Sequence, residues 1–120
     1  MDPRSRLGRL SELVARNWLR LRGWRILSAG ARWNGVQVDI VARRGSLVAV
    51  VEVKSRRRPY PVAPVGGRQL DRLERVARVL AGRRAFKKCV VRVDVLEVTW
   101  HRGLVPVVRH SADVGGSAGA

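Results

Sequence analysis

The sequence predicts one α/β domain in which helices flank a mixed β-sheet. Two segments carry apolar residues at three- and four-residue spacing, which is typical of a helix with one buried face. Several short segments rich in valine and isoleucine, bounded by glycine-containing turns, are typical of strands. Their order is helix, three strands, helix, one or two strands, which favours helices packed against a sheet. The length of 120 residues suits a single domain, expected over residues 1–110.

The first helix is predicted over residues 6–22, where leucine, valine and tryptophan recur along one face. Gly23 follows as a helix stop. Three strands are expected next, and residues 43–46 form a tight turn between the second and the third. The strands are predicted over residues 24–27, 36–42 and 47–54.

The second half of the chain begins with a predicted loop at residues 59–67, which contains three prolines and two glycines. A second helix is predicted over residues 68–82, with one apolar face and arginines along the others. Two strands, 89–99 and 104–109, are expected to complete the sheet. Residues 111–120 have little to bury, so they are expected to form a disordered tail.

The charge balance points to a polyanionic partner. Lysine and arginine number 25, aspartate and glutamate nine, and the formal net charge is +16. Such a surface attracts phosphate backbones and releases their counterions. Codon bias in a GC-rich genome would explain the preference for arginine over lysine, but not the shortage of acids. DNA is therefore the expected partner class.

Other classes of protein are disfavoured. Cys89 is the one cysteine, so no intramolecular disulfide forms, and its apolar neighbours predict a buried, inert thiol. No apolar stretch reaches the ~18 residues of a membrane span, and no secretory signal is evident. A soluble, cytoplasmic protein without membrane contact is expected. No zinc-ligand spacing, phosphate-binding glycine loop or serine nucleophile motif is present, and His101 and His110 have no evident partner.

The segment from Val48 to Lys54 carries the most specific chemical signal. It is a continuous apolar run, typical of a strand buried on both faces, until Glu52 and Lys54 interrupt it. Side chains two residues apart on a strand share a face, so this carboxylate and this amine project together. Alone, the pattern is more often a solvated ion pair worth less than ~1 kcal/mol.

The preceding strand carries Gln37 and Asp39 on one face. A two- or four-residue loop centred on Arg44-Gly45 would place Gln37 opposite Glu52 and make Asp39 a diagonal neighbour of Glu52. A three-residue loop would put the two carboxylates on opposite faces. The functional interpretation depends on this register.

Two converging carboxylates raise a pKa unless a cation lies between them. Mg²⁺ or Mn²⁺ bound by Asp39 and Glu52 would relieve that repulsion, activate a water molecule and polarise a phosphodiester. Lys54 would orient the water or stabilise the transition state. Glu12 and Gln69 are further candidates for the catalytic site, although a surface glutamate and a polar residue at a helix start are the plainer interpretations.

Basic and aromatic residues near the predicted turn and strand ends are candidates for DNA contact. A run of charge is usually a solvated face, but a run directly after Lys54 favours phosphate binding. Trp33 and Tyr60 could stack on bases, with packing as the alternative. The candidate DNA-binding residues are Arg43, Arg44, Arg56, Arg57, Arg58 and Arg68.

These residues resemble the YraN family, small bacterial proteins similar to archaeal Holliday-junction resolvases and to the PD-(D/E)xK restriction-endonuclease-like superfamily. The resemblance covers residues 6–99. It implies a restriction-endonuclease-like αβββαβ core, a metal held by Asp39 and Glu52, and Lys54 in the catalytic position. It also implies action on branched or repair-intermediate DNA. Resolvases act as dimers, so a homodimer is a further hypothesis, although the sequence shows no clear dimer seam. The matching segments are 8–19 with Glu12, 23–27, 38–43, 51–56 and 92–95.

The chain departs from the family pattern at three places. Gln37 stands where the family usually has glutamate, Gln69 where a lysine is usual, and Ala29-Gly30 where Arg-Asn is usual. Three hypotheses follow. The chain is a Mg²⁺- or Mn²⁺-dependent endonuclease, a non-catalytic nucleic-acid-binding module that keeps the fold, or an adaptor in a repair or ribosome-linked complex.

Overall fold

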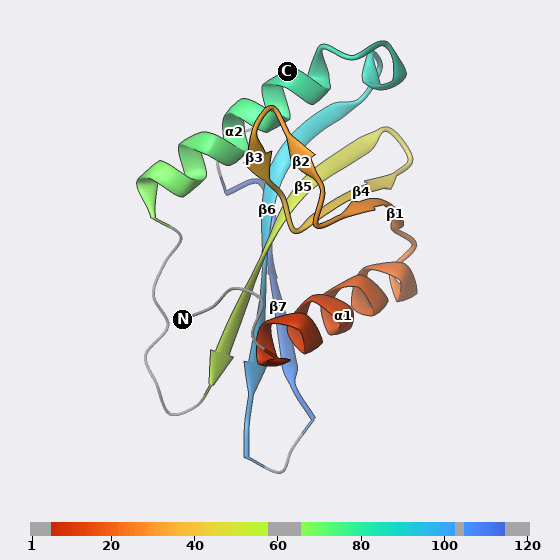
Figure 1. Ribbon diagram of the computed structural model, residues 1–120. Coiled ribbons are helices and arrows are strands. Elements are labelled where there is room, and N and C mark those ends of the chain that lie inside the picture. The colour runs from red at the N-terminus through yellow and green to blue at the C-terminus, as the bar shows by residue number, and fades with distance from the viewer. Residues whose placement is uncertain (1–5, 58–65, 103–104, 115–120) are drawn as a thin grey trace.

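The computed structural model describes residues 6–57, 66–102 and 105–114. A five-stranded sheet in the order β1-β4-β5-β6-β7 forms its centre (Figure 1). β5 and β6 are parallel, and the other neighbouring strands are antiparallel. The elements are α1 (Arg6–Leu21), β1 (Arg25–Ala29), β2 (Arg32–Trp33), β3 (Val36–Gln37), β4 (Ile40–Arg44), β5 (Leu47–Arg57), α2 (Gly67–Ala81), a 3₁₀ turn η1 (Arg84–Phe86), β6 (Val90–Trp100) and β7 (Val107–Ser111).

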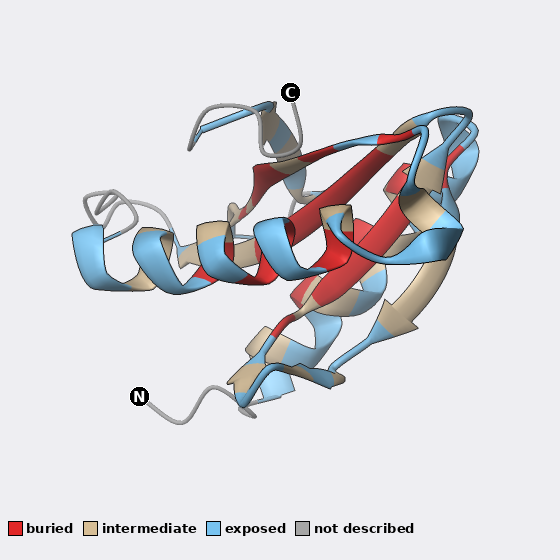
Figure 2. Ribbon diagram, turned by 90° about the horizontal axis from the view of Figure 1, so that it is seen from above, coloured by how far each residue is buried: buried red, intermediate tan, exposed pale blue. Residues whose placement is uncertain are grey.

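The two helices cover opposite faces of the sheet. α1 packs through Ala15 and Leu19 against one face, and α2 packs through Leu73, Val76 and Leu80 against the other. Alternate residues of the valine-rich strands supply the two layers, because successive side chains of a strand point to opposite faces. The buried strands lie between the helices in Figure 2. The α/β class and the αβββαβ order of sheet elements expected of a restriction-endonuclease-like core are confirmed.

Within the described ranges, neither helix is long and apolar enough to cross a membrane.

The predicted strand over residues 36–42 is wrong as a single element. Its first part, β3, pairs with β2 in a separate two-stranded sheet, and only its second part belongs to the central sheet. The cause is the Asn34-Gly35 turn, in which both residues have positive φ, 52° and 77°. Type I′ hairpin turns require this conformation, and Asn-Gly is their preferred sequence. The chain therefore folds back on itself before it enters the sheet.

The predicted β4–β5 register is also wrong. Each residue of β4 pairs with a β5 residue two positions later than predicted. Ile40 pairs with Val51 and Arg44 with Leu47, so the turn is the two-residue Gly45-Ser46. Gly45 has φ +62°, the requirement for the first central residue of a type II′ turn. An even shift leaves every side chain on its predicted face. Gln37 does not lie opposite Glu52, because Gln37 pairs with Arg32 in the small hairpin.

The ordered chain continues past residue 110, where the domain was expected to end. Ser111 pairs with Val95 in β7, and the Val114 N–H donates a 2.8 Å hydrogen bond to the Val93 carbonyl. Residues 111–114 are therefore part of the fold and not of a tail. Residues 115–120 of the predicted tail, and most of the predicted 59–67 loop with Arg58 and Tyr60, lie outside the described residues.

A buried carboxylate on β6 ties the end of the chain to the sheet. Asp94 is fully buried and accepts hydrogen bonds from Arg92 Nε at 2.8 Å and from the Asp113 N–H at 2.9 Å. His110 Nε2 lies 2.7 Å from Asp94 Oδ2. The Trp18 ring meets the His110 ring edge to face. The expectation that His110 lacks a partner is therefore wrong.

Candidate active site

Asp39 and Glu52 lie together where the β4–β5 pairing ends. β4 begins at Ile40, directly after Asp39, and Ile40 pairs with Val51, directly before Glu52. The Val53 N–H donates a 2.8 Å hydrogen bond to Asp39 Oδ2. This bond holds the aspartate against β5 just beyond the last ladder pair. The two predicted carboxylates are thus close neighbours, directly across the strands and not diagonal as expected.

Glu52 is a buried acid, only 8% exposed. Burial raises the pKa of Glu52 to about 8, the neighbouring charge of Asp39 adds to the increase, and Lys54 opposes it. Desolvation and a like charge both favour the protonated form of a carboxyl group. At neutral pH Glu52 therefore favours its protonated form, despite the adjacent Lys54. A divalent cation beside it would favour the ionised form.

Glu12 reaches the same place from α1. Burial raises the pKa of Glu12, and both the charge of Asp39 and a hydrogen bond with it add to the increase. The preceding residue, Ser11, is fully buried. Its hydroxyl donates to Ser55 Oγ and accepts from Trp100 Nε1, each at 2.8 Å. These bonds fix the rotation of α1 about its axis, and thereby direct Glu12 toward Asp39.

Lys54 is held beside Glu52 by the second helix. Its Nζ lies 3.6 Å from Glu52 Oε1 and donates a 2.9 Å hydrogen bond to Gln69 Oε1. Gln69 lies in the first turn of α2, on the side of the sheet that Glu52 and Lys54 face. The five residues predicted as catalytic are therefore brought together from α1, the start of β4, β5 and α2.

The carboxylates suit an ion that keeps most of its water. In the described part of the chain, no group of three or more His, Cys, Asp or Glu side chains is arranged to hold a metal ion. Glu12 interacts with Asp39, but the three acids Glu12, Asp39 and Glu52 do not converge on one point. Mg²⁺, however, commonly binds through one or two carboxylates plus substrate phosphates and retains several waters. Asp39 and Glu52 fit that mode, because the Val53 N–H engages only one oxygen of Asp39.

The predicted DNA-binding arginines do not gather at one place. Arg56 follows Glu52 and Lys54 on the same face of β5, Arg57 is exposed at the end of that strand, and Arg68 is exposed beside Gln69. These three lie on the elements that carry the carboxylates and lysine.

Arg43 and Arg44 lie instead at the β4–β5 turn. They pair with Val48 and Leu47, four and five residues before Glu52 on β5. That separation is roughly 13–17 Å. Arg44 stacks over Trp24, with its Cζ 4.6 Å from the ring centroid. These two arginines are part of the packing at the far end of the sheet.

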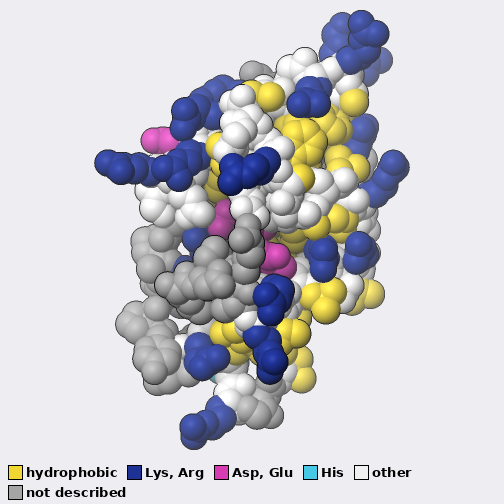
Figure 3. All heavy atoms as spheres, in the orientation of Figure 1, with side chains coloured by type: hydrophobic (Ala, Val, Ile, Leu, Met, Phe, Trp, Pro, Cys, Tyr) yellow, Lys and Arg dark blue, Asp and Glu magenta, His cyan; other side chains and the backbone are white. Residues whose placement is uncertain are grey.

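A hollow of about 450 Å³ opens beside Glu52, between the β2–β3 hairpin and α2. Figure 3 shows acidic side chains in the middle of this face, with lysine and arginine side chains above and below them. This hollow was not predicted from the sequence. Two signals for it were present: arginines three residues apart on α2, and the Asn34-Gly35 turn of the hairpin that forms the opposite wall. The lining residues are Arg32, Asn34, Gly35, Val36, Gln37, Glu52, Gln69, Arg72, Leu73 and Arg75.

Comparison with known proteins identifies the family. The model of the uncharacterised protein family UPF0102 matches residues 11–98. The chain belongs to the UPF0102 family. A UPF0102 protein of Paramagnetospirillum magneticum is 43% identical over 102 residues, covering 79% of each chain. A UPF0102 protein of Streptomyces griseus is 35% identical over 118 residues, covering 95% of this chain and 99% of its own. The predicted membership of the YraN family is confirmed.

The solved structures include one that is similar to this chain at low sequence identity. SfsA of Pyrococcus furiosus, determined in complex with Ca²⁺, is 17% identical, with a TM-score of 0.43. The match covers 92% of this chain and 61% of SfsA.

The raised pKa of Glu52 predicts a pH-dependent stability. In the unfolded chain Glu52 ionises near 4.5, whereas in the folded protein it stays protonated up to about 8. Without metal, the free energy of unfolding should fall as pH rises through this window, by up to about 1.4 kcal/mol per pH unit from this group. Thermal unfolding in EDTA across the window measures the slope.

Added Mn²⁺ should raise the unfolding temperature most at the upper end of that window, because a cation binds the ionised carboxylate. Glu52→Gln is the control, and it should remove both the slope and the Mn²⁺ effect. An unchanged slope in this variant would show that another group causes it.

Proposed function

We propose that this protein is a metal-dependent endonuclease that hydrolyses phosphodiester bonds in DNA, including branched or repair-intermediate DNA. The supporting observation is the buried Glu52 beside the half-buried Asp39, with the pKa of Glu52 raised to about 8 and the Lys54 amine 3.6 Å from Glu52 Oε1. Burying the Glu52 carboxyl group beside a second acid destabilises the folded protein, because Glu52 must take up a proton that it would lose in water. A site for a cation and a phosphate explains why they are placed there.

Each residue has a distinct role in this proposal. Asp39 and Glu52 hold Mg²⁺ or Mn²⁺, which when bound supplies Lewis acidity and an acidified water. Lys54 places a positive charge where negative charge develops on the phosphate oxygens. Gln69 positions Lys54 through its hydrogen bond, and Glu12 orients water through Asp39. The neighbouring Arg56, Arg57 and Arg68 bind flanking phosphates.

The direct test incubates the protein with linear duplex, single-stranded and four-way-junction DNA, with Mg²⁺, with Mn²⁺ and with EDTA. Cleavage is expected only with a divalent cation. Lys54→Met, which keeps the length of the side chain and removes its charge, should reduce the rate by about 10²–10³-fold. Cleavage in EDTA, or equal rates for wild type and Lys54→Met, would contradict the proposal. Size-exclusion chromatography with junction DNA tests the expected homodimer.

Gln69→Leu should lower kcat about tenfold with little change in KM, because Lys54 loses its positioning partner while the phosphate-binding surface stays intact. Single-turnover and steady-state kinetics on the preferred DNA measure this split. Gln69→Glu is the matched comparison, since it retains an acceptor for Lys54 and should recover part of the rate. A rise in KM alone would assign Gln69 to DNA binding instead.

A non-catalytic nucleic-acid-binding module is the second candidate. It is favoured by the lack of a third acidic ligand around one point among the described residues, and by Gln37, which lines the hollow where a further carboxylate would strengthen metal binding. The same cleavage assay decides between the two. Binding without cleavage under every metal condition would favour the module.

A further inference from the structure

The hollow beside Glu52 is lined by cationic and amide-bearing side chains. Arg72 and Arg75 enter it from α2, and Arg32 enters it from the β2–β3 hairpin. Gln37 and Asn34 bring side-chain amides, which can donate to and accept from the edge of a base. Guanidinium groups bind phosphate in a bidentate manner and stack on the faces of bases. The walls therefore match the parts of a nucleotide.

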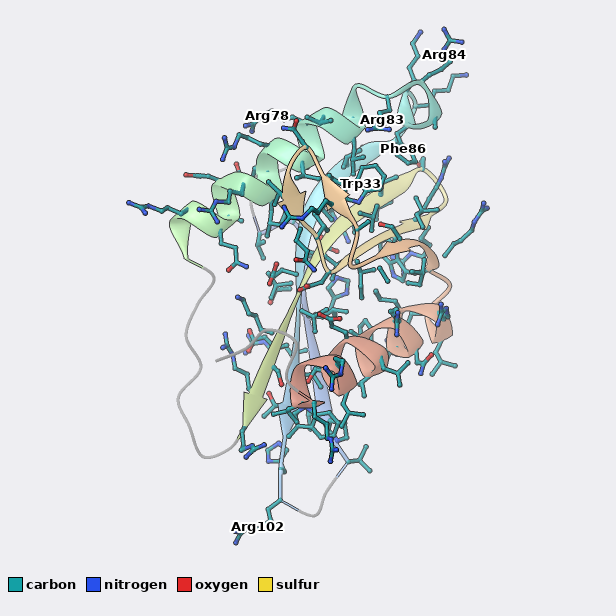
Figure 4. The ribbon with its side chains drawn as sticks, in the orientation of Figure 1. Trp33, Arg78, Arg83, Arg84, Phe86 and Arg102 are labelled. Carbon is teal, nitrogen blue, oxygen red and sulfur yellow. The ribbon has the colours of Figure 1, made fainter. Side chains whose placement is uncertain are left out.

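The hollow is walled by packed elements. Trp33 of β2 packs against the core on the α2 side, and the Arg83 guanidinium lies over its ring, 5.2 Å from the centroid (Figure 4). The Val38 N–H donates a 3.0 Å hydrogen bond to the Ala31 carbonyl at the base of the hairpin. On the opposite side, Leu73 is buried in the core under α2. Such a preformed space is typical of a ligand site, and its volume of about 450 Å³ is within the usual range.

We propose that this hollow binds one unpaired nucleotide of a nucleic-acid strand, next to the phosphodiester bond presented to Asp39 and Glu52. The inference rests on the proposed function and specifies its substrate. A base within a duplex is stacked and paired, so it must leave the helix before it can enter a space of this size. Single strands, bulges and junction branch points present a nucleotide without that cost. Substrate choice then follows from local unpairing and not from sequence.

The test measures binding in EDTA, so that it does not depend on cleavage. Fluorescence anisotropy at fixed salt compares a labelled single strand, a perfect duplex of equal length and the same duplex with one bulged nucleotide. The single strand and the bulged duplex are expected to bind on the order of tenfold more tightly than the perfect duplex. Gln37→Trp fills the hollow without changing its charge, so it should remove this preference.

Two arginine variants separate the hollow from general electrostatic attraction. Arg72→Ala/Arg75→Ala removes two charges inside it and should weaken binding of the single strand and the bulged duplex more than that of the perfect duplex. Arg78→Ala/Arg84→Ala removes two charges outside it, on α2 and η1 (Figure 4). The outer variant should weaken all three DNAs equally and leave the preference intact. Circular dichroism confirms that each variant is folded.

The outcomes separate the two proposals. Equal affinities of the wild type for the three DNAs would overturn the inference, even if the protein cleaves DNA, and so would equal effects of the two arginine variants. If the wild type prefers the single strand and the bulged duplex but shows no metal-dependent cleavage, the nucleotide site is supported and the proposed nuclease activity is rejected. Thymidine monophosphate is the probe for a free nucleotide. If it displaces the single strand as efficiently as unlabelled oligothymidylate does, the occupant is a free nucleotide and the strand assignment is wrong.

Discussion

Glu52→Gln is expected to lower metal-dependent cleavage by on the order of 10³-fold or more, with the fold retained. The amide keeps the shape of the side chain but carries no charge, so it is a poor ligand for Mg²⁺ or Mn²⁺. The substitution also removes the buried acid whose pKa is raised by desolvation and by Asp39. The unfolding temperature in EDTA near neutral pH should therefore stay constant or rise. Loss of activity with unchanged or increased stability would identify a functional residue.

Glu97→Gln is the matched control for this experiment. Glu97 lies on β6 and pairs with Lys54 in the parallel register. The substitution therefore removes a carboxylate from the adjacent strand. It should retain most of the cleavage activity, and calorimetric titration should still detect Mn²⁺ binding. Wild-type activity in Glu52→Gln, or an equal loss in both variants, would show that Glu52 has no specific role.

Asp94→Ala should cause the largest loss of stability, about 3–5 kcal/mol, because it leaves the Arg92 guanidinium partly buried without its partner. Burial alone would raise the pKa of Asp94, but hydrogen bonds from His110, the Asp113 N–H and Arg92 lower it overall. Because the pKa of Asp94 is lowered, its ionised carboxylate stabilises the folded state at pH values above the ordinary aspartate pKa of 3.8. This contribution is lost as the pH falls from 3.8 through the lowered pKa. The unfolding temperature should fall by on the order of 10 °C.

Asp71→Asn is the control for Asp94→Ala, since Asp71 is an exposed acid on α2. It should change the free energy of unfolding by less than about 0.5 kcal/mol. Urea denaturation at neutral and acidic pH measures both variants. The difference between Asp94→Ala and the wild type should shrink at the acidic end. A difference independent of pH would indicate lost packing and not the lost charge.

Much of the candidate site could be predicted from local patterns. Glu52 and Lys54 share a face because side chains alternate along a strand, and this holds for any pairing partner. Asp39 stayed on the predicted face because the error in the register was even. Gln69 was identified from its place at the start of a helix, and its hydrogen bond to Lys54 gives that position a role.

Other features depend on interactions between distant segments. The Asn34-Gly35 turn was available as a hairpin signal, but the apolar alternation from Val36 to Ile40 favoured one long strand and concealed it. The partnership of Asp94 and His110 joins residues 16 apart on neighbouring strands. Sequence spacing carries no information about it. Likewise, Arg44 stacks on Trp24, a contact that no local pattern predicts.

The parallel pairing of β5 and β6 also affects how the chain is made. Each residue of β5 pairs with one 43 positions later, from Leu47 with Val90 to Arg57 with Trp100. At roughly 5–20 residues per second, a ribosome takes roughly 2–9 s to add that many residues. During this interval the valine-rich β5 exposes an open edge that can pair with another chain. The nascent protein is therefore most prone to aggregate after residue 57 and before residue 100, when the candidate catalytic residues of β5 already exist but their neighbouring strand does not.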